Sequence, residues 1–276
     1  MVNPESLLRA AFATAIDAAR PDSCVPHFLP AYPLGQTVVV GAGKAAAAMA
    51  LALDRHWSAD LRGTVVTAHR HGLDCPRIRV LEAAHPLPIE AGQRAAEQML
   101  QSVTGLGPDD LVICVISGGG SALMPLPAIG LALEDKQTLT RDLLRSGATI
   151  SEINCVRRHL SRIKGGRLGA ACYPARLVTL AISDVPGDDP VDIASGPTVG
   201  DPTTCADALG ILDRYLISVP APSRAALAAG TWESVKPGDR RLARSEFHIV
   251  AAPQQSLEAA ARLAAAHGVT PWILSD

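Results

Sequence analysis

The sequence contains few aromatic residues and no excess of positive charge. Phe, Trp and Tyr make up 3% of the 276 residues, within an apolar content of 48%. Packing must therefore rely on Ala, Leu, Val and Ile, which is typical of doubly wound α/β proteins. The formal net charge is −2, so the chain lacks the basic surface that nucleic-acid binding requires. We expect no nucleic-acid partner.

The sequence also lacks cysteine pairs, a signal peptide and long apolar runs. Its six cysteines are scattered without a C-x-x-C pair, which is typical of free thiols in a reducing compartment and not of a disulfide framework or a zinc site. Near the N-terminus, Leu8, Phe12 and Ile16 are spaced for an amphipathic helix. The longest apolar runs, such as 45–53, are too short to span a bilayer. The sequence predicts a cytoplasmic protein with no membrane association.

Short apolar segments alternate with helical patterns over most of the chain. We predict strands at 37–40, 63–68, 78–82, 111–116 and 177–182, and helices at 45–54, 89–103, 134–146 and 151–162. This alternation predicts a doubly wound, mainly parallel sheet with helices on both faces, which is a Rossmann-like α/β fold. We assign this domain to residues 1–217.

The composition changes after Leu216. Residues 218–245 are rich in Pro, Gly and Arg and are predicted to form a linker. Residues 246–276 follow the pattern strand, helix, strand, with the second strand at 269–274, and we interpret them as the truncated start of a second α/β domain. A single βαβ unit cannot cover both faces of its strands. The alternative is therefore that this unit adds to the first sheet.

The loop after the strand at 177–182 is crowded with carboxylates. No Lys or Arg occurs between Leu177 and Asp213. Uncompensated carboxylates repel one another and any nearby phosphate, unless a divalent cation or a basic group from elsewhere intervenes. Because ligands bind beyond the carboxyl ends of parallel strands, the loop is a candidate site; a solvated acidic turn is the alternative. Its acidic residues are Asp184, Asp188, Asp189, Asp192 and Asp201.

A glycine turn, GAGKAA, follows the first predicted strand. Its residues Gly41 and Gly43 match the dinucleotide-binding pattern only loosely, and the next strand ends without the acidic residue that this pattern expects. The turn nevertheless opens a helix, whose free N–H groups favour an anion. Lys44 lies in the first turn, where a cation opposes the helix dipole. We predict that Lys44 contacts a phosphate or carboxylate; a lysine extended into solvent is the alternative.

A second glycine turn, SGGGS, follows the apolar strand at 111–116. Consecutive glycines are costly in conformational entropy, and they are tolerated where the backbone must approach a ligand closely. Their N–H groups can form a concave site for phosphate or carboxylate oxygens. We predict anion binding here, with a plain tight turn as the alternative. The residues concerned are Ser117, Gly118, Gly119, Gly120 and Ser121.

The segment INCVRRHLSRIKGGR carries a cluster of basic residues. Arg157, Arg158 and Arg162 are interpreted as a solvated helical face. Lys164 and Arg167 flank two glycines at the helix end and are the better candidates for anion contact.

Three histidines lie in the loops after the second and third strands. His69, His71 and His85 have no carboxylate or cysteine at ligand spacing, so we interpret them as polar loop residues. Among the three, the role of His85, which precedes Pro86 between two apolar segments, stays open.

Four segments together resemble the glycerate 2-kinase family, whose second domain is known as the MOFRL domain. They are GAGKAA, SGGGSALMP, INCVRRHLSRIKGGR and ISDVPGDDPVDIASGPT, in this order. The resemblance covers nearly the whole chain, and the last two segments are its most diagnostic parts. It implies ATP-dependent phosphorylation of D-glycerate at its 2-hydroxyl to give 2-phosphoglycerate, with Mg²⁺. Family members continue through a complete second domain, so this chain is expected to be truncated within it.

Phosphoryl transfer requires positioning and charge neutralisation, and we assign residues to these roles as a hypothesis. Lys44 is assigned to a phosphate or to the glycerate carboxylate. Asp184 is predicted to orient or deprotonate the 2-hydroxyl, and Asp189 is the next candidate; either could hold Mg²⁺ directly or through water. The expected partners are D-glycerate and ATP, and assembly into a homo-oligomer stays open.

Two other functions also stay open. Many family members carry the older name hydroxypyruvate reductase, which would imply an NAD(P)-dependent reaction, but the missing ribose-binding acid argues against it. The second is a ligand-binding remnant without catalysis, because a site built between two domains loses one wall when one domain is incomplete.

Overall fold

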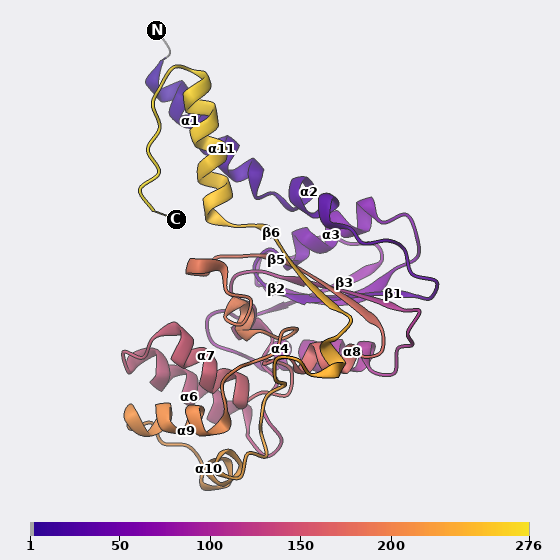
Figure 1. Cartoon of the computed structure of the whole chain (residues 1–276), viewed down its shortest axis with the longest axis vertical. Helices are drawn as coiled ribbons and strands as arrows, with labels where there is room; N and C mark the ends of the chain where they lie inside the picture. The colour runs from indigo at the N-terminus through magenta and orange to yellow at the C-terminus, as the bar shows by residue number, and fades with distance from the viewer. Residues whose placement is uncertain (1–2, 276) are drawn as a thin grey trace.

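The centre of the protein is a six-stranded sheet, described by a computed structural model that covers residues 3–275 (Figure 1). The strand order is β3-β2-β1-β4-β5-β6 and all neighbours are parallel. This is the strand order of dinucleotide-binding Rossmann folds, and the predicted parallel α/β sheet is confirmed. The strands are β1 (Thr37–Ala42), β2 (Arg62–Ala68), β3 (Ile78–Ala83), β4 (Leu111–Ile116), β5 (Arg176–Ile182) and β6 (Ser245–Ala251).

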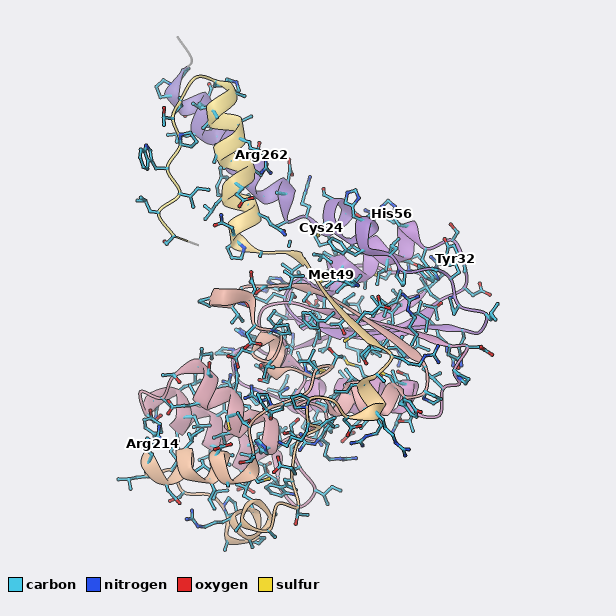
Figure 2. All side chains as sticks on the ribbon, viewed as in Figure 1. Cys24, Tyr32, Met49, His56, Arg214 and Arg262 are labelled. Atoms are coloured by element: carbon cyan, nitrogen blue, oxygen red, sulfur yellow. The ribbon has the colours of Figure 1, made fainter. Side chains whose placement is uncertain are left out.

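Alternate residues of the central strands face two separate cores. Val38 and Val40 of β1 pack into the core on the side of α4 (Glu90–Val103) and α8 (Arg167–Cys172). Val39 packs into the opposite core, on the side of α3 (Ala46–His56), where Met49 is fully buried (Figure 2). A period of two is the geometry of a strand. Because helices cover both faces, these strands are apolar throughout.

Four helices form a third, smaller core beside the sheet (Figure 1). They are α6 (Leu133–Arg145), α7 (Ile150–His159), α9 (Cys205–Arg214) and α10 (Ala221–Ala228). Capping boxes define two of their starts, with Thr149 and Glu152 at α7 and with Thr204 and Asp207 at α9. The acidic loop therefore runs from the end of β5 to this helical unit.

Helix α11 (Pro253–Ala266) packs against α1 (Pro4–Ala18), and the pair extends away from the sheet (Figure 1). No residue of α1 is fully buried, and Leu8 and Phe12 are 71% and 70% exposed. The short helices α2 (Pro21–Cys24) and η1 (Val25–Phe28) connect α1 to the segment before β1. Across residues 3–275, no helix combines the length and the apolar character needed to cross a bilayer.

The segment after the predicted linker joins the first sheet. Strand β6 pairs in parallel with β5, with Thr179 opposite Phe247, so residues 245–251 follow the alternative interpretation and not the start of a separate sheet. The strand predicted at 269–274 is wrong, because residues 269–275 form no strand. An apolar run needs a neighbouring strand to pair with, and this one lies along solvent, with Trp272 83% exposed. The boundaries at 217 and 245 stay a prediction.

Two lysines are buried where the helical unit meets the sheet domain. Lys136 Nζ donates to Leu160 O at 2.6 Å, and Lys164 Nζ donates to Met124 O at 2.7 Å. Both side chains are almost completely inaccessible to solvent. Burial lowers the pKa of Lys136 to about 7 and that of Lys164 well below its usual value, and nearby cations act in the same direction. Their burial therefore makes protonation unfavourable in the native state.

We expect Lys136→Met to flatten the pH dependence of stability. The native state releases this proton near pH 7, whereas the unfolded chain keeps it up to about pH 10.4. Because the unfolded state binds more protons in this window, Lys136 makes the free energy of unfolding rise with pH, by up to about 1.4 kcal/mol per pH unit. Urea unfolding of both proteins between about pH 7 and pH 9.5 measures the two slopes. Equal slopes would contradict the expectation.

Candidate functional site

The sheet has its topological switch point between β1 and β4. From β1 the chain proceeds to β2 and β3 on one side and later to β4 on the other. In open α/β sheets, ligands bind at such a switch, beyond the carboxyl ends of the strands. The turns that follow β1 and β4 contain Lys44 and residues 117–121 respectively. Both predicted glycine turns therefore lie at this position.

Backbone contacts hold the two glycine turns against each other. The Lys44 N–H donates to Gly118 O at 2.9 Å, and the Ala45 N–H donates to the buried Ser117 hydroxyl at 2.9 Å. Gly43 has a φ of +147°, and a side chain there would overlap Ser117. Only glycine satisfies both conditions. The first turn is therefore shaped by its contact with the second.

Three of the predicted anion-binding glycines serve packing instead. Gly41 lies inside β1, and Gly120 begins α5 (Gly120–Leu123); a Cβ at either position would collide with neighbouring atoms. The Gly43 N–H already donates to Val66 O at 3.1 Å. All three glycines are buried, so their positions give them no direct access to a ligand.

Three charged or titratable side chains converge on Gly118 and Gly119. A Cβ on Gly119 would lie 3.0 Å from His85 Cδ2 and 3.4 Å from Lys44 Cε, and a Cβ on Gly118 would overlap the Asp184 carboxylate. Lys44 and Asp184 therefore share one cleft. Within residues 3–275, no acceptor is found for the N–H groups of Gly118 and Gly119. These two amides are free to bind an anion.

A cavity of about 260 Å³ opens beside these groups. The side chains of Lys44 and Asp184 are exposed near it. A space of this size lies below the usual range for drug-sized ligands and suits a small polar molecule. Ser121 is half-buried in its wall and shares a hydrogen bond with Ser195 Oγ at 2.8 Å. Residues that matter chemically in the lining are His85, Gly118, Gly119, Arg157, Asp184 and Asp192.

His85 belongs to this site, although the sequence left it as a polar loop residue. Partial burial lowers the pKa of its imidazole, and the charges of Lys44 and Arg157 add to this effect while Asp184 opposes it. At neutral pH the ring is therefore mostly uncharged. A neutral imidazole can accept a proton from a group bound in the cavity.

Arg157 was missed by sequence reasoning. It was interpreted as part of a solvated face, yet it is half-buried and lines the cavity. Its guanidinium donates to Asn154 Oδ1 at 3.3 Å and forms no ion pair within residues 3–275. A guanidinium without a carboxylate partner in a cavity wall is a strong candidate for binding an anionic ligand.

Two of the five loop carboxylates are compensated by Arg158, which was also assigned to the solvated face. Arg158 is buried and forms ion pairs with Asp192 at 3.2 Å and with Asp201 at 3.0 Å. These pairs anchor the loop to α7 and remove much of the repulsion expected among its carboxylates. Asp184 and Asp188 have no side-chain hydrogen bond or ion pair within the described range, and of these two only Asp184 lines the cavity beside Gly118.

Lys164 and Arg167 do not face this cavity. The Lys164 Nζ is buried against Met124 O. The Arg167 guanidinium donates to four backbone carbonyls, including Trp232 O at 2.6 Å and Arg158 O at 2.8 Å, and it lines a different cavity. The pattern KGGR predicted a basic helix end, but it could not show that both side chains donate to backbone oxygens.

Asp184 is the loop carboxylate best placed for a metal ion. Mg²⁺ is usually held by one or two carboxylates together with water and substrate phosphates, and a carboxylate without a protein partner beside free amides fits this arrangement. Asp189 is exposed, accepts the Val191 N–H at 3.0 Å and does not line the cavity. Its role as a ligand stays a prediction.

One other cluster in residues 3–275 has the composition of a metal site. Ligand atoms of His159, Cys205 and Glu233 lie within 4.8 Å of one another. The Lys236 ammonium pairs with Glu233 at 2.6 Å and supplies the positive charge that a metal ion would bring. We therefore assign this cluster to structural hydrogen bonding.

Comparisons with known proteins agree on one family. Residues 7–228 match the family model described as a domain of unknown function, DUF4147. A D-glycerate 2-kinase of Thermotoga maritima is 37% identical over 280 residues, which cover 100% of this chain and 66% of that protein. A provisionally named hydroxypyruvate reductase of Agrobacterium vitis is 52% identical over 276 residues, covering 100% of this chain and 62% of the relative.

A solved structure agrees with this result. The crystal structure of glycerate kinase from Thermotoga maritima superposes with a TM-score of 0.87 at 37% identity, covering 96% of this chain and 64% of that one. The chain thus spans between 62% and 66% of the length of these relatives. The family model covers most of the chain, and all four segments that carried the resemblance lie within it. The chain therefore belongs to the DUF4147 family, the glycerate 2-kinase family that its motifs resemble.

Proposed function

We propose that the protein transfers a phosphoryl group from ATP to the 2-hydroxyl of D-glycerate, giving 2-phosphoglycerate. The observation that carries this proposal is the convergence of Lys44, His85 and Asp184 on the free amides of Gly118 and Gly119. The Thermotoga maritima relatives named D-glycerate 2-kinase and glycerate kinase, of which this chain covers 66% and 64%, support glycerate phosphorylation. Phosphoryl transfer mainly requires positioning and charge neutralisation, and this arrangement offers both.

The cationic groups of the cavity suit two anionic reactants. Lys44 lies beside Gly119, and Arg157 lines the same cavity as the free amides. One can hold the carboxylate of glycerate while the other offsets the charge of the transferred phosphoryl group. We assign Arg157 to the carboxylate, because a guanidinium can bind two oxygens in one plane, and Lys44 to the phosphate.

The proton of the 2-hydroxyl must leave as the phosphoryl group arrives. His85 and Asp184 both face the cavity and are the available acceptors. The lowered pKa of His85 keeps its ring neutral and able to take the proton. We propose that His85 receives the proton and that Asp184 orients the hydroxyl and holds Mg²⁺. When bound there, Mg²⁺ would neutralise charge on the phosphate oxygens of ATP.

The second candidate function is NAD(P)-dependent reduction of hydroxypyruvate. The strand order and the name of the Agrobacterium vitis relative favour it. Against it, β2 ends in Thr67 and Ala68, so the carboxylate that binds a ribose in such enzymes is missing. The Thr67 hydroxyl instead donates to Lys44 O at 3.1 Å.

Two assays on the same protein separate these functions from simple binding. Coupled detection of ADP release with D-glycerate and Mg-ATP should give turnover that requires both substrates and the metal. Oxidation of NADH with hydroxypyruvate should stay at background. If calorimetry detects D-glycerate binding but no ADP appears, the protein is a binding remnant and the kinase proposal is wrong.

Lys44→Ala should lower kcat/KM for phosphorylation by about 100- to 1000-fold, because the charge that offsets the developing phosphate is lost. The side chain is exposed, so the free energy of unfolding should change by less than about 0.5 kcal/mol. Arg145→Ala, an exposed cation on α6 outside the cavity, is the matched control. Activity equal to the control would remove Lys44 from the site.

Arg157→Met should raise KM for D-glycerate by about tenfold with a smaller effect on kcat, because it removes ground-state binding of the carboxylate. Initial rates at varied D-glycerate concentrations and saturating ATP measure KM and kcat separately. Glycerol, which has no carboxylate, serves as the comparison substrate. A loss confined to kcat would instead place Arg157 at the phosphate.

The pKa of His85 should respond to its charged neighbours in opposite directions. Lys44→Met removes a cation and should raise it, whereas Asp184→Asn removes an anion and should lower it further. NMR titration of the imidazole measures both shifts without any assay of activity. In the active protein, the acidic limb of kcat/KM should lie below the ordinary histidine value of about 6.5. Shifts of the same sign in both variants would contradict the arrangement.

A further inference from the structure

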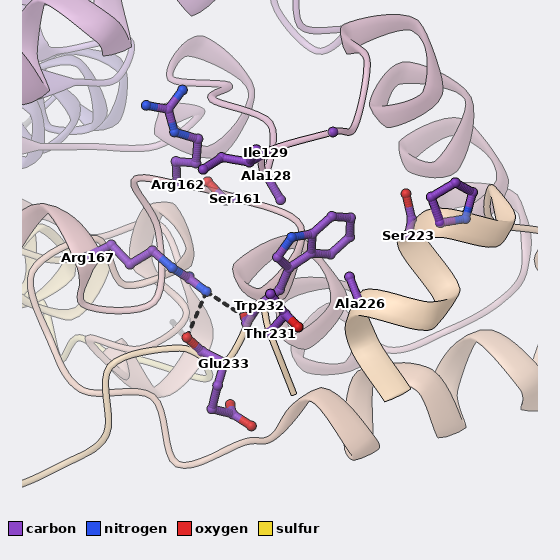
Figure 3. A pocket seen from close by; sticks show the side chains of 12 residues that line it. Ala128, Ile129, Ser161, Arg162, Arg167, Ser223, Ala226, Thr231, Trp232 and Glu233 are labelled. Carbon is purple, nitrogen blue, oxygen red and sulfur yellow. Dashed lines mark hydrogen bonds between the residues drawn. The ribbon is translucent and has the colours of Figure 1, made fainter. Parts of the chain in front are cut away.

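A second and larger cavity lies on the helical side of the molecule (Figure 3). Its volume is about 520 Å³, and it shares no lining residue with the candidate active site. The segment 128–130, residues of the basic segment at 161–167, helix α10 and residues 231–233 form its walls. This volume is typical of pockets that hold an organic ligand.

The walls are mostly apolar and contain a tryptophan in a chain that has only three. Figure 3 shows the Trp232 indole between α10, which carries Ala226, and the segment with Ala128 and Ile129. Ile129 is 79% exposed although it lines the cavity. A flat ring placed against the indole and these aliphatic side chains would remove apolar surface from water.

The charged groups of the cavity leave a net positive charge. The Arg162 guanidinium is exposed and has no hydrogen bond or ion pair within residues 3–275. Arg167 donates only to neutral backbone carbonyls, two of which are drawn in Figure 3. The Glu233 carboxylate is engaged by Lys236 at 2.6 Å and by His159 at 3.0 Å. The cavity therefore favours a ligand with one negative charge. Figure 3 shows the Arg162 guanidinium turned away from the Trp232 indole, so this exposed side chain must swing toward the cavity to bind the ligand.

A buried hydroxyl in the wall has no partner. Ser223 lies in the first turn of α10 and is 1% exposed, and its Oγ forms no hydrogen bond within the described residues. An unpaired buried hydroxyl costs stability. The Oγ is inaccessible to solvent, so a contact with a molecule seated in the cavity requires the Ser223 side chain to rotate about χ1.

We propose that this cavity is a second binding site, and that its ligand is an aromatic carboxylate with a two-ring planar system. The indole and aliphatic walls take the rings, Arg162 binds the carboxylate, and Ser223 donates to or accepts from a ring substituent or a carboxylate oxygen. One free guanidinium matches the single charge of a carboxylate better than the double charge of a phosphate ester. The inference is independent of the proposed kinase activity.

Calorimetric titration with 2-naphthoate tests the proposal. We expect binding with a Kd of the order of 0.1–1 mM, as for a small ligand with one charged contact. The uncharged 2-naphthamide should bind at least about fivefold more weakly, and acetate should show no binding. No heat with 2-naphthoate up to about 5 mM would overturn the proposal.

Variants locate the binding. Arg162→Gln should weaken 2-naphthoate about tenfold, and Ser223→Ala should weaken it a few-fold while leaving the thermal midpoint equal or higher, since an unpaired hydroxyl is removed. Arg145→Gln is the matched surface control and Lys44→Ala the control for the other cavity; both should bind as the unaltered protein does. If Arg162→Gln and Ser223→Ala bind 2-naphthoate as tightly as the unaltered protein does, the ligand binds elsewhere. Loss of 2-naphthoate binding in Lys44→Ala would show the same.

Discussion

The hydrogen bond from the Lys44 N–H to Gly118 O is the contact on which the candidate site depends. Strands β1 and β4 are paired neighbours, so their carboxyl ends emerge side by side. The turns that follow must then share a small space, which only glycine allows at Gly43. The contact uses the amides that the first turn would otherwise offer and leaves those of Gly118 and Gly119 free. The amides left available to an anion are thus those of the turn after β4, not those of the turn after β1.

The distribution of charge around the candidate site depends on two adjacent arginines of α7. Arg158 turns toward the acidic loop and pairs with Asp192 and Asp201, while Arg157 turns toward the cavity. The buried pairs hold the loop in place, so Asp184 is the carboxylate that lies beside the free amides without compensation. The loop pairs thus leave Asp184 uncompensated in the cavity that Arg157 also lines, with Lys44 nearby.

Much of the fold and part of the site could be predicted from the sequence. Uniformly apolar strands and capped helices are local signals, and Lys44, Asp184 and residues 118–119 follow directly on strands whose ends meet. Helical spacing gives the direction of each side chain around the helix axis, but it does not show which element that side chain faces. The sequence therefore gave the wrong surroundings for Arg157, Arg158 and Lys164. The apolar segment 269–274 has the composition of a strand, but it lies beside no edge of the sheet with which it could pair. His85 was not placed in the site because Lys44 and Asp184, the neighbours beside it there, are distant from it in sequence.

The pairing of α1 with α11 has a consequence for synthesis of the chain. Helix α1 ends at Ala18 and its partner begins at Pro253, and α1 buries no residue completely. A helix of 15 residues is marginal in water by itself. At ribosomal rates of about 5–20 residues per second, its partner emerges roughly 10–50 seconds later. Throughout that interval, the apolar side chains of α1 lack the helix against which they pack in the complete structure.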